Sequence, residues 1–237
     1  MPMSTFVIVP GAWDRPATIE PVIEPLESAG HAVVVVDLPC SDADATLQEY
    51  ADAVRAVLPD DLTDVVLVGY SFGGFTASRI AVEHPDLPVV YVAGWIPRDG
   101  VSVIDLFAGG DPFEAGEEAG IAAFDGVFLS AGPGLCALNV ERYVAAADPS
   151  ERDAIKSYLE RTQRPQGIVA LREKWRGDPQ AGRCTYVLTT ADTLVSPEAQ
   201  RVMAASVGAN VVEIDTDHGV FRQQPDRLAE LLVATTR

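Results

Sequence analysis

The first pattern in the chain is a series of short hydrophobic runs separated by segments with a helical repeat. The run from Ala32 to Val36 shows no alternation of hydrophobic and polar positions, which is typical of a strand in a parallel sheet covered on both faces. The runs that predict strands are Thr5 to Val9, Ala32 to Val36, Val65 to Val68, Val89 to Ala93, Thr185 to Leu188 and Val211 to Ile214. Strands that alternate with helices indicate an α/β fold with a mostly parallel central sheet flanked by helices.

Helices are predicted between most of these strands. The clearest one lies between the second and third strands, where hydrophobic residues recur with the spacing of one helix face at Leu47, Tyr50, Ala51, Val54 and Leu58. The other helices predicted for this α/β part are Thr18 to Ala29, Phe75 to Val82, Pro197 to Val207 and Pro225 to Val233.

The alternation of strands and helices is interrupted between Pro97 and about Gly182. Glycines punctuate this part, and no run in it has the pattern of a strand. Its predicted helices are Ser102 to Phe107, Glu117 to Phe124, Val140 to Ala147, Glu151 to Glu160 and Ile168 to Trp175. We interpret the interruption as a mainly helical cap, residues 97–182, inserted into one α/β core that residues 1–96 and 183–237 form together.

The composition fits one folded domain and excludes several classes of partner. The chain has 237 residues, of which 48% are hydrophobic, and this is enough for a full core. Its formal net charge of −18 opposes binding to nucleic acid, because such binding needs basic groups to neutralise phosphates. No hydrophobic run approaches the roughly 20 residues of a membrane-spanning helix. We therefore expect a small-molecule substrate, no nucleic-acid partner and no membrane partner.

The cysteines and the N-terminal residues bear on the cellular compartment. The three cysteines, Cys40, Cys136 and Cys184, are far apart and form no Cys-x-x-Cys motif. Such a set indicates reduced thiols rather than a disulfide framework. The first residues also lack the basic region of a secretory signal. The expected location is cytoplasmic, and a homodimer remains open.

The strongest chemical motif is Gly69-Tyr70-Ser71-Phe72-Gly73-Gly74, which directly follows the predicted strand Val65 to Val68 and precedes a predicted helix. A Gly-x-Ser-x-Gly pattern between a strand and a helix is typical of a nucleophile elbow, in which a sharp turn exposes the serine hydroxyl. The alternative is a glycine-rich turn with a solvated serine. The context favours Ser71 as a nucleophile.

A serine hydroxyl needs a neighbouring base to remove its proton, and the sequence offers three histidines. His31 precedes a strand and is expected to be structural, while His84 ends the helix after the elbow, about a helix length from Ser71. His218 follows the last predicted strand, at the sheet edge where functional loops of parallel sheets collect. We expect His218 to be the general base.

The histidine in turn needs a carboxylate that fixes its tautomer and stabilises the imidazolium ion. Asp192 follows the strand Thr185 to Leu188 at the same sheet edge, and the order Ser71, Asp192, His218 is the one that this fold favours. Asp99, after the strand Val89 to Ala93, is the second candidate.

An oxyanion hole requires backbone N–H groups aimed at the developing negative charge. One is expected from Phe72, directly after Ser71. The other is expected from Ala12, in the loop after the first strand, for which a plain turn is the alternative.

The chain resembles alpha/beta hydrolases, specifically the branch of small plant esterases, hydroxynitrile lyases and their bacterial esterase-like relatives. The matching motifs are Val9-Pro10-Gly11-Ala12-Trp13, Gly30-His31 before Asp37-Leu38-Pro39, Gly69-Tyr70-Ser71-Phe72-Gly73-Gly74, Trp95-Ile96-Pro97, Thr190-Ala191-Asp192 before Pro197-Glu198, and Asp217-His218. The resemblance covers nearly the whole chain and is weakest in the cap. It implies an eight-stranded, mostly parallel sheet and a triad of Ser71, Asp192 and His218, with Ala12 and Phe72 as oxyanion donors.

The chain departs from this pattern at several positions. Many relatives have His-Gly where this chain has Pro10-Gly11, and many have a histidine in place of Tyr70. Hydroxynitrile lyases have a lysine directly after the catalytic histidine, where this chain has Gly219, so the lyase reaction is disfavoured. The run Asp14-Arg15-Pro16 also differs from the small, His- and Trp-containing run common there.

The leading hypothesis is hydrolysis of a carboxylic ester, lactone or thioester of a small hydrophobic substrate through an acyl-enzyme on Ser71. We expect Trp13, Tyr70 and Trp95 to contact the substrate. The alternatives are a cyclase, C–C lyase or acyltransferase with the same fold, or a receptor-like protein that binds a small molecule. Neither metal-ligand spacing nor a dinucleotide or phosphate loop occurs, so no metal and no organic cofactor are expected.

Overall fold

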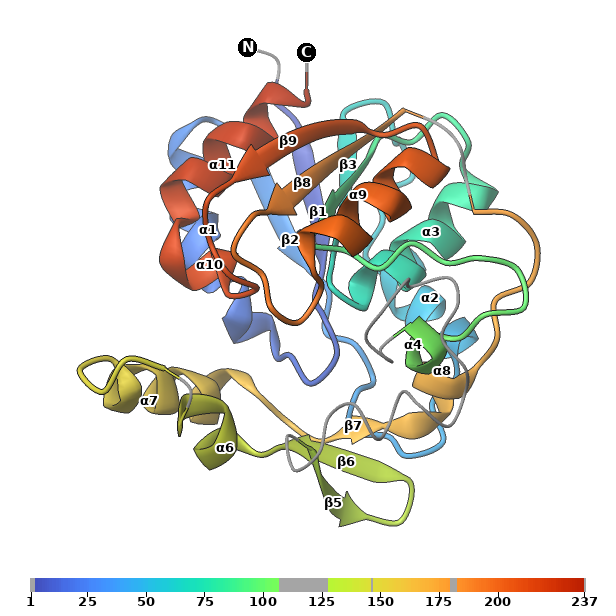
Figure 1. The fold of residues 1–237 in the computed structure, drawn as a ribbon. Helices are drawn as coiled ribbons and strands as arrows, with labels where there is room; N and C mark the ends of the chain where they lie inside the picture. Colours follow the sequence, from blue (N-terminus) through green and yellow to red (C-terminus); the bar gives the residue numbers. More distant parts are fainter. Residues whose placement is uncertain (1–2, 107–127, 146, 180–182, 237) are drawn as a thin grey trace.

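The computed structural model describes residues 3–106, 128–145, 147–179 and 183–236. In this part of the chain the main sheet has six strands in the order β2-β1-β3-β4-β8-β9, and every neighbouring pair is parallel (Figure 1). The strands are β1 (Thr5–Val9), β2 (Ala32–Val35), β3 (Val65–Tyr70), β4 (Val89–Val92), β8 (Cys184–Thr189) and β9 (Asn210–Ile214).

Two layers of helices cover the two faces of this sheet. One layer contains α1 (Glu20–Ser28), α10 (Val220–Gln223) and α11 (Pro225–Ala234), and the other contains α2 (Leu47–Arg55), α3 (Gly73–Glu83) and α9 (Pro197–Ser206). Successive strand residues point to opposite layers: Val7 and Leu67 pack toward α2 and α3, while Ile8 and Val68 pack toward α1 and α11. This two-sided burial explains why the strands are continuously hydrophobic.

The described part of the segment between β4 and β8 contributes no strand to the main sheet. Its described elements are α4 (Val103–Leu106), β5 (Phe128–Gly132), β6 (Leu135–Leu138), α6 (Val140–Ala145), α7 (Arg152–Thr162), β7 (Gln166–Gly167) and α8 (Ile168–Arg172). It lies over one end of the sheet, whereas both termini lie at the opposite end (Figure 1). The boundaries of a cap at residues 97 and 182 stay a prediction.

The α/β fold class is confirmed, and three finer expectations are corrected. The described main sheet has six strands, whereas the family resemblance implied eight. The segment expected to lack strands forms a three-stranded antiparallel sheet, β5-β6-β7. Its strands were missed because they are short, with only two to five residues each, and because the turn between β5 and β6 has Gly132 and Gly134 at positive φ. The first predicted helix is divided into the 3₁₀ helix η1 (Pro16–Thr18) and α1. The predicted helix Glu117 to Phe124 lies outside the described residues.

Cys40, Cys136 and Cys184 form no disulfide bond with one another. Among the described residues, no helix is long and hydrophobic enough to cross a membrane.

The turn between β3 and α3 is packed against backbone on two sides. A Cβ atom on Gly73 would lie 2.3 Å from the carbonyl oxygen of Val9, and one on Gly74 would lie 2.4 Å from that of Trp95. Both distances are shorter than any real contact, so only glycine fits at these positions. The first turn of α3 is thereby held directly against the ends of β1 and β4.

We predict that Gly73→Ala destabilises the protein severely, by about 3 kcal/mol or more, because the methyl group meets backbone that cannot move aside. Gly208→Ala is the matched control, since Gly208 has φ +65° but no atom within 4 Å of the Cβ position. We expect a loss of only about 1 kcal/mol for the control, from the left-handed backbone alone. Chemical denaturation followed by circular dichroism measures both losses, and equal losses would contradict close packing at Gly73.

Candidate active site

Ser71 occupies the sharp turn between β3 and α3. Its φ of +50° lies in the left-handed region, which a residue with a side chain adopts only when the surrounding structure enforces it. Ser71 N–H donates to the carbonyl of Val92 at 3.2 Å, and the Ser71 carbonyl accepts from Trp95 N–H at 2.9 Å. Two backbone hydrogen bonds therefore fix the turn on the β4 side. The side chain of Ser71 is directed away from this end of the sheet.

Ser71, His218 and Asp192 are joined by hydrogen bonds between their side chains. The Nε2 atom of His218 lies 3.0 Å from Ser71 Oγ, and its Nδ1 atom lies 2.8 Å from Asp192 Oδ2. The three residues follow β3, β9 and β8 respectively, so the sequence-distant strand ends meet at one edge of the sheet. The geometry matches the relation of nucleophile, base and orienting carboxylate.

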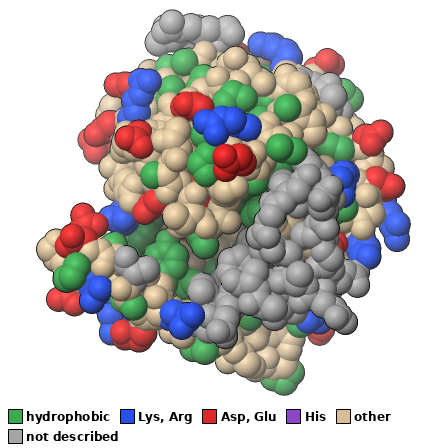
Figure 2. All heavy atoms as spheres, in the orientation of Figure 1, with side chains coloured by type: hydrophobic (Ala, Val, Ile, Leu, Met, Phe, Trp, Pro, Cys, Tyr) green, Lys and Arg blue, Asp and Glu red, His purple; other side chains and the backbone are tan. Residues whose placement is uncertain are grey.

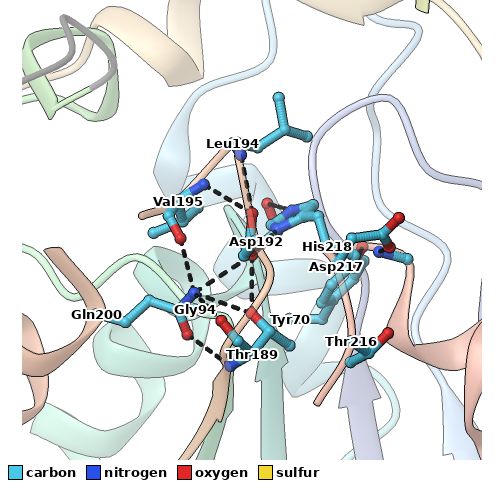
Figure 3. A network of polar contacts seen from close by, with 12 residues as sticks. Tyr70, Gly94, Thr189, Asp192, Leu194, Val195, Gln200, Thr216, Asp217 and His218 are labelled. Atoms are coloured by element: carbon cyan, nitrogen blue, oxygen red, sulfur yellow. Dashed lines mark hydrogen bonds and ion pairs between the residues drawn. The ribbon is translucent and has the colours of Figure 1, made fainter. Parts of the chain in front are cut away.

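Asp192 is buried, with 3% of its surface exposed, and it is held by several donors (Figure 3). Its Oδ1 atom accepts from the backbone N–H groups of Leu194 and Val195, both at 2.9 Å, and its Oδ2 atom accepts from Thr189 Oγ1 at 2.8 Å. Gln200 Nε2 contacts the same oxygen at 3.3 Å. Burial acts to raise the pKa of Asp192, but His218 and these donors outweigh it and hold the pKa below 3.8.

His218 is positioned by its backbone as well as by its ring. The hydroxyl of Tyr70 donates to the His218 carbonyl at 2.8 Å, and the two rings lie 5.2 Å apart. Burial acts to lower the pKa of His218, but the neighbouring Asp192, with smaller contributions from Asp14 and Asp217, raises it above 6.5. The imidazolium form is thus stabilised where a proton from Ser71 could be received.

The other candidates from the sequence lie elsewhere. His31 is buried and accepts from Ser4 N–H at 3.2 Å, as expected of a structural residue. His84 stands at the C-terminal cap of α3, away from the turn that begins this helix. Asp99 is exposed and accepts from Gly177 N–H at 2.8 Å, so the structure does not bring it to His218.

Ala12 and Phe72 lie on the two sides of Ser71. Ala12 lines the cavity beside Ser71, and Phe72 is the residue from which α3 begins. Among the described residues, neither backbone N–H group donates to a protein acceptor. Backbone N–H groups away from water are normally paired, so two unpaired donors beside a serine point to an external acceptor. This arrangement suits an oxyanion.

The cavity next to Ser71 lies between the end of the sheet and the α6–α7 segment. It offers about 110 Å³, where one water molecule needs roughly 10–15 Å³. Hydrophobic side chains gather in the hollow between that segment and the body of the molecule (Figure 2). Trp13, Tyr70 and Trp95, the residues expected to contact substrate, all line the cavity.

Sequence reasoning missed several residues that line this cavity. They are Asp14, Thr18, Leu138, Tyr143, Tyr158, Leu159, Gln163, Leu194, Val195, Gly219 and Phe221. The sequence did mark Asp14, since the run beginning there departs from the family pattern. No sequence signal marked the residues from the α6–α7 segment as cavity-lining, because helical periodicity shows which face of a helix is buried but not which part of the molecule that face packs against. Among the described residues, no group of three or more His, Cys, Asp or Glu side chains could hold a metal ion.

Comparison with known proteins agrees with this geometry. A sequence model of the Alpha/beta hydrolase family matches residues 6–231, nearly the whole chain. The chain belongs to the alpha/beta hydrolase family. The fold, the serine turn and the order of the three hydrogen-bonded residues in this family member are therefore explained by common descent.

Several relatives are similar over their full length. A carbendazim hydrolyzing esterase of Nocardioides sp. (strain SG-4G) is 26% identical, and the match covers 98% of this chain and 99% of the relative. An extracellular alpha/beta-hydrolase from a Paenibacillus species has a TM-score of 0.78 at 22% identity, with both chains covered completely. A pyrethroid hydrolase from Sphingobium faniae JZ-2 has a TM-score of 0.75 at 20% identity, covering 99% of this chain and 98% of the other. At this level of identity, the two structures show a shared fold.

We predict that Asp192→Asn lowers the pKa of His218, because burial is then opposed only by the smaller contributions of Asp14 and Asp217. Titration of the imidazole signals by nuclear magnetic resonance measures this value. With three histidines in the chain, His218→Gln identifies the His218 signal, and those of His31 and His84 serve as internal references. A pKa that stays the same or rises would show that Asp192 does not stabilise the imidazolium.

Proposed function

We propose that the protein hydrolyses a carboxylic ester, or a related lactone or thioester, of a small and mostly hydrophobic substrate. The observation that carries this proposal is the continuous hydrogen-bonded chain from Ser71 through His218 to Asp192 beside an aromatic cavity. The match to the carbendazim hydrolyzing esterase over nearly the whole of both chains supports the ester class.

In the proposed reaction, Ser71 Oγ attacks the ester carbonyl while its proton moves to Nε2 of His218. The oxygen–carbon bond to Ser71 forms, and the carbonyl becomes a tetrahedral oxyanion. His218 then gives its proton to the departing alkoxide, the bond to the alcohol breaks, and an acyl-enzyme remains. Water, deprotonated by the same His218, attacks this acyl group and releases the acid, and Ser71 recovers its proton.

Three features of the site lower the barrier to these steps. Asp192 stabilises the imidazolium that forms on His218, across a 2.8 Å hydrogen bond. The unpaired N–H groups of Ala12 and Phe72 are the proposed donors to the oxyanion, and such donors act most strongly where water is excluded. The left-handed turn at Ser71 fixes the nucleophile before substrate arrives, so little entropy is lost in positioning it.

We predict that Ser71→Ala loses at least about a thousandfold in kcat/KM on a panel of esters and lactones, because the acyl-enzyme can no longer form. Ser157→Ala is the matched control, since Ser157 is an exposed serine on α7 whose hydroxyl bonds only Asp153 within its own helix. Parallel assays of wild type and both variants give the comparison. A serine-reactive phosphonate should label wild type and the control but not Ser71→Ala.

The result of this panel also separates the other classes of function. Full activity in Ser71→Ala would overturn the acyl-enzyme mechanism. If the phosphonate labels Ser71 but no ester is turned over, the result would favour transfer or cyclisation chemistry on the same nucleophile. If Ser71 is not labelled and no ester is turned over, the result would favour a binding protein.

We predict that kcat/KM rises with pH and reaches half of its maximum above pH 6.5. The base must be neutral to accept a proton, and the carboxylates around His218 raise its pKa above 6.5. Activity is therefore low while His218 is protonated and increases as the pH passes through its folded-state pKa. Steady-state kinetics across pH at constant ionic strength measure the midpoint. A value of kcat/KM that does not rise with pH would argue against His218 as the base.

A further inference from the structure

The proposed hydrolysis gives no role to Asp14, a carboxyl group that lines the cavity. Asp14 follows β1 in the same loop as Ala12, is only 5% exposed, and lines the cavity together with Ser71 and His218. Burial raises its pKa to about 6 even though several hydrogen bonds act to lower it. A carboxylate in such a place needs partners, because burying an unpaired charge is costly.

The hydrogen bonds of Asp14 are divided unevenly between its two oxygens. The Oδ1 atom accepts from Thr18 Oγ1 at 3.0 Å and from Gln163 Nε2 at 2.6 Å, which occupies both of its lone pairs. Among the described residues, the Oδ2 atom accepts one hydrogen bond, from Gly11 N–H at 3.0 Å. Oδ2 therefore keeps one lone pair free.

The free lone pair belongs to the oxygen that lies close to the nucleophile. Asp14 Oδ2 and Ser71 Oγ lie 2.8 Å and 3.4 Å from the same point, the position that a Cβ atom on Gly11 would occupy. A Cβ atom on Gly11 would press on both of these side chains. A substrate whose carbonyl carbon reaches Ser71 thus places its neighbouring atoms within reach of Asp14.

Among the described residues, no permanently charged cation lines the cavity beside Asp14. The lining includes no Lys or Arg, and no Lys or Arg side chain forms an ion pair with the Asp14 carboxylate. His218 lines the cavity too, but as the proposed base it must be neutral before Ser71 attacks. Arg164 is nearby, but its Nε atom bonds the backbone carbonyl of Asp14, and its Nη2 atom bonds Asp37 and the Leu38 carbonyl. The net charge of −18 adds to the negative potential at the site.

Aromatic rings form much of the remaining wall. They are those of Trp13, Tyr70, Trp95, Tyr143, Tyr158 and Phe221. The faces of such rings attract cations. A buried carboxylate with a free lone pair, in a cavity with aromatic walls and without a Lys or Arg among its described lining residues, is complementary to a protonated nitrogen.

We propose that Asp14 makes this site selective for esters that carry a protonated amine near the scissile carbonyl. The inference rests on the proposed ester hydrolysis. The ammonium N–H donates to Asp14 Oδ2, and the aromatic rings surround its alkyl groups. Asp14 is thus a substrate-binding residue, and the three residues Ser71, His218 and Asp192 carry out the chemistry.

Pairs of esters that differ only in charge test this selectivity at pH 7.5. With the cation on the alcohol side, 2-(dimethylamino)ethyl phenylacetate is compared with 3-methylbutyl phenylacetate. With the cation on the acyl side, methyl 4-(dimethylaminomethyl)benzoate is compared with methyl 4-isobutylbenzoate. We expect wild type to favour the amine by about tenfold or more in kcat/KM in at least one pair, mostly through KM, since tenfold corresponds to about 1.4 kcal/mol.

Asp14→Asn removes the charge and keeps the shape of the side chain. Its amine-to-neutral ratio should fall to about one, whatever its absolute rate. The matched control is Asp217→Asn, which removes a carboxylate that also raises the pKa of His218 but is not among the residues that line the cavity. The control should keep the wild-type ratio. If Asp217→Asn lowers the ratio as much as Asp14→Asn does, the selectivity comes from the general acidic field and the inference is wrong.

The outcomes distinguish this inference from the proposed function. Hydrolysis of the neutral esters without preference for the amine in either pair would overturn the role of Asp14 and leave ester hydrolysis intact. If no ester is hydrolysed, the proposed function fails. Calorimetry of the four esters with Ser71→Ala, and with Ser71→Ala combined with Asp14→Asn, then still tests recognition. If Ser71→Ala binds the amine ester and its neutral isostere with equal affinity, the inference is wrong. This test needs no turnover, and it does not depend on the folding of the Asp14→Asn variant.

Discussion

The arrangement of the site depends on the close contact between the first turn of α3 and the ends of β1 and β4. No side chain fits at Gly73 or Gly74, because the backbone of Val9 and Trp95 already occupies the space. That contact forces the chain through a left-handed conformation at Ser71, which the hydrogen bonds to Val92 and Trp95 then maintain. The strain at one residue is thus compensated by the packing of three sheet-end segments, and it gives the nucleophile a fixed position.

The same sheet end brings Asp192, Asp14 and His218 together in a small buried volume. The surroundings of the two aspartates shift their pKa values in opposite directions. Asp192 receives two backbone N–H groups, a hydroxyl and His218, so its pKa falls below 3.8. Asp14 receives one backbone N–H, a hydroxyl and an amide, and burial raises its pKa to about 6. Two aspartates near one histidine are thereby suited to different tasks: one is committed to an internal partner, and the other retains capacity for an external one.

The sequence predicted the main sheet and the meeting of Ser71, Asp192 and His218 because both follow from local patterns. Continuous hydrophobic runs identify buried parallel strands, and residues directly after such strands share one edge of the sheet. The remainder depends on contacts between distant segments. The strand β7 forms because Gln166 and Gly167 pair with Cys136 and Leu135 of β6, about 30 residues away, which no local pattern reveals. Asp14 stood out as a departure from the family, but its burial and its approach to Ser71 through Gly11 needed the structure.

Hydrogen bonds join the loop after β1 to residues 163–166, which follow α7. Trp13 N–H donates to Gln166 Oε1 at 3.2 Å, Arg164 N–H donates to the Trp13 carbonyl at 2.7 Å, and Gln163 Nε2 donates to Asp14. The loop that holds Ala12 and Asp14 is therefore the same loop that binds the segment after α7. Each of these hydrogen bonds is worth about 1 kcal/mol, so separation of the loop from residues 163–166 is opposed by several of them together. A change at Gln163 alters the surroundings of Asp14, because Gln163 bonds its carboxylate. The proposed selection of substrate by Asp14 and the attachment of residues 163–166 to the loop thus depend on the same hydrogen bonds.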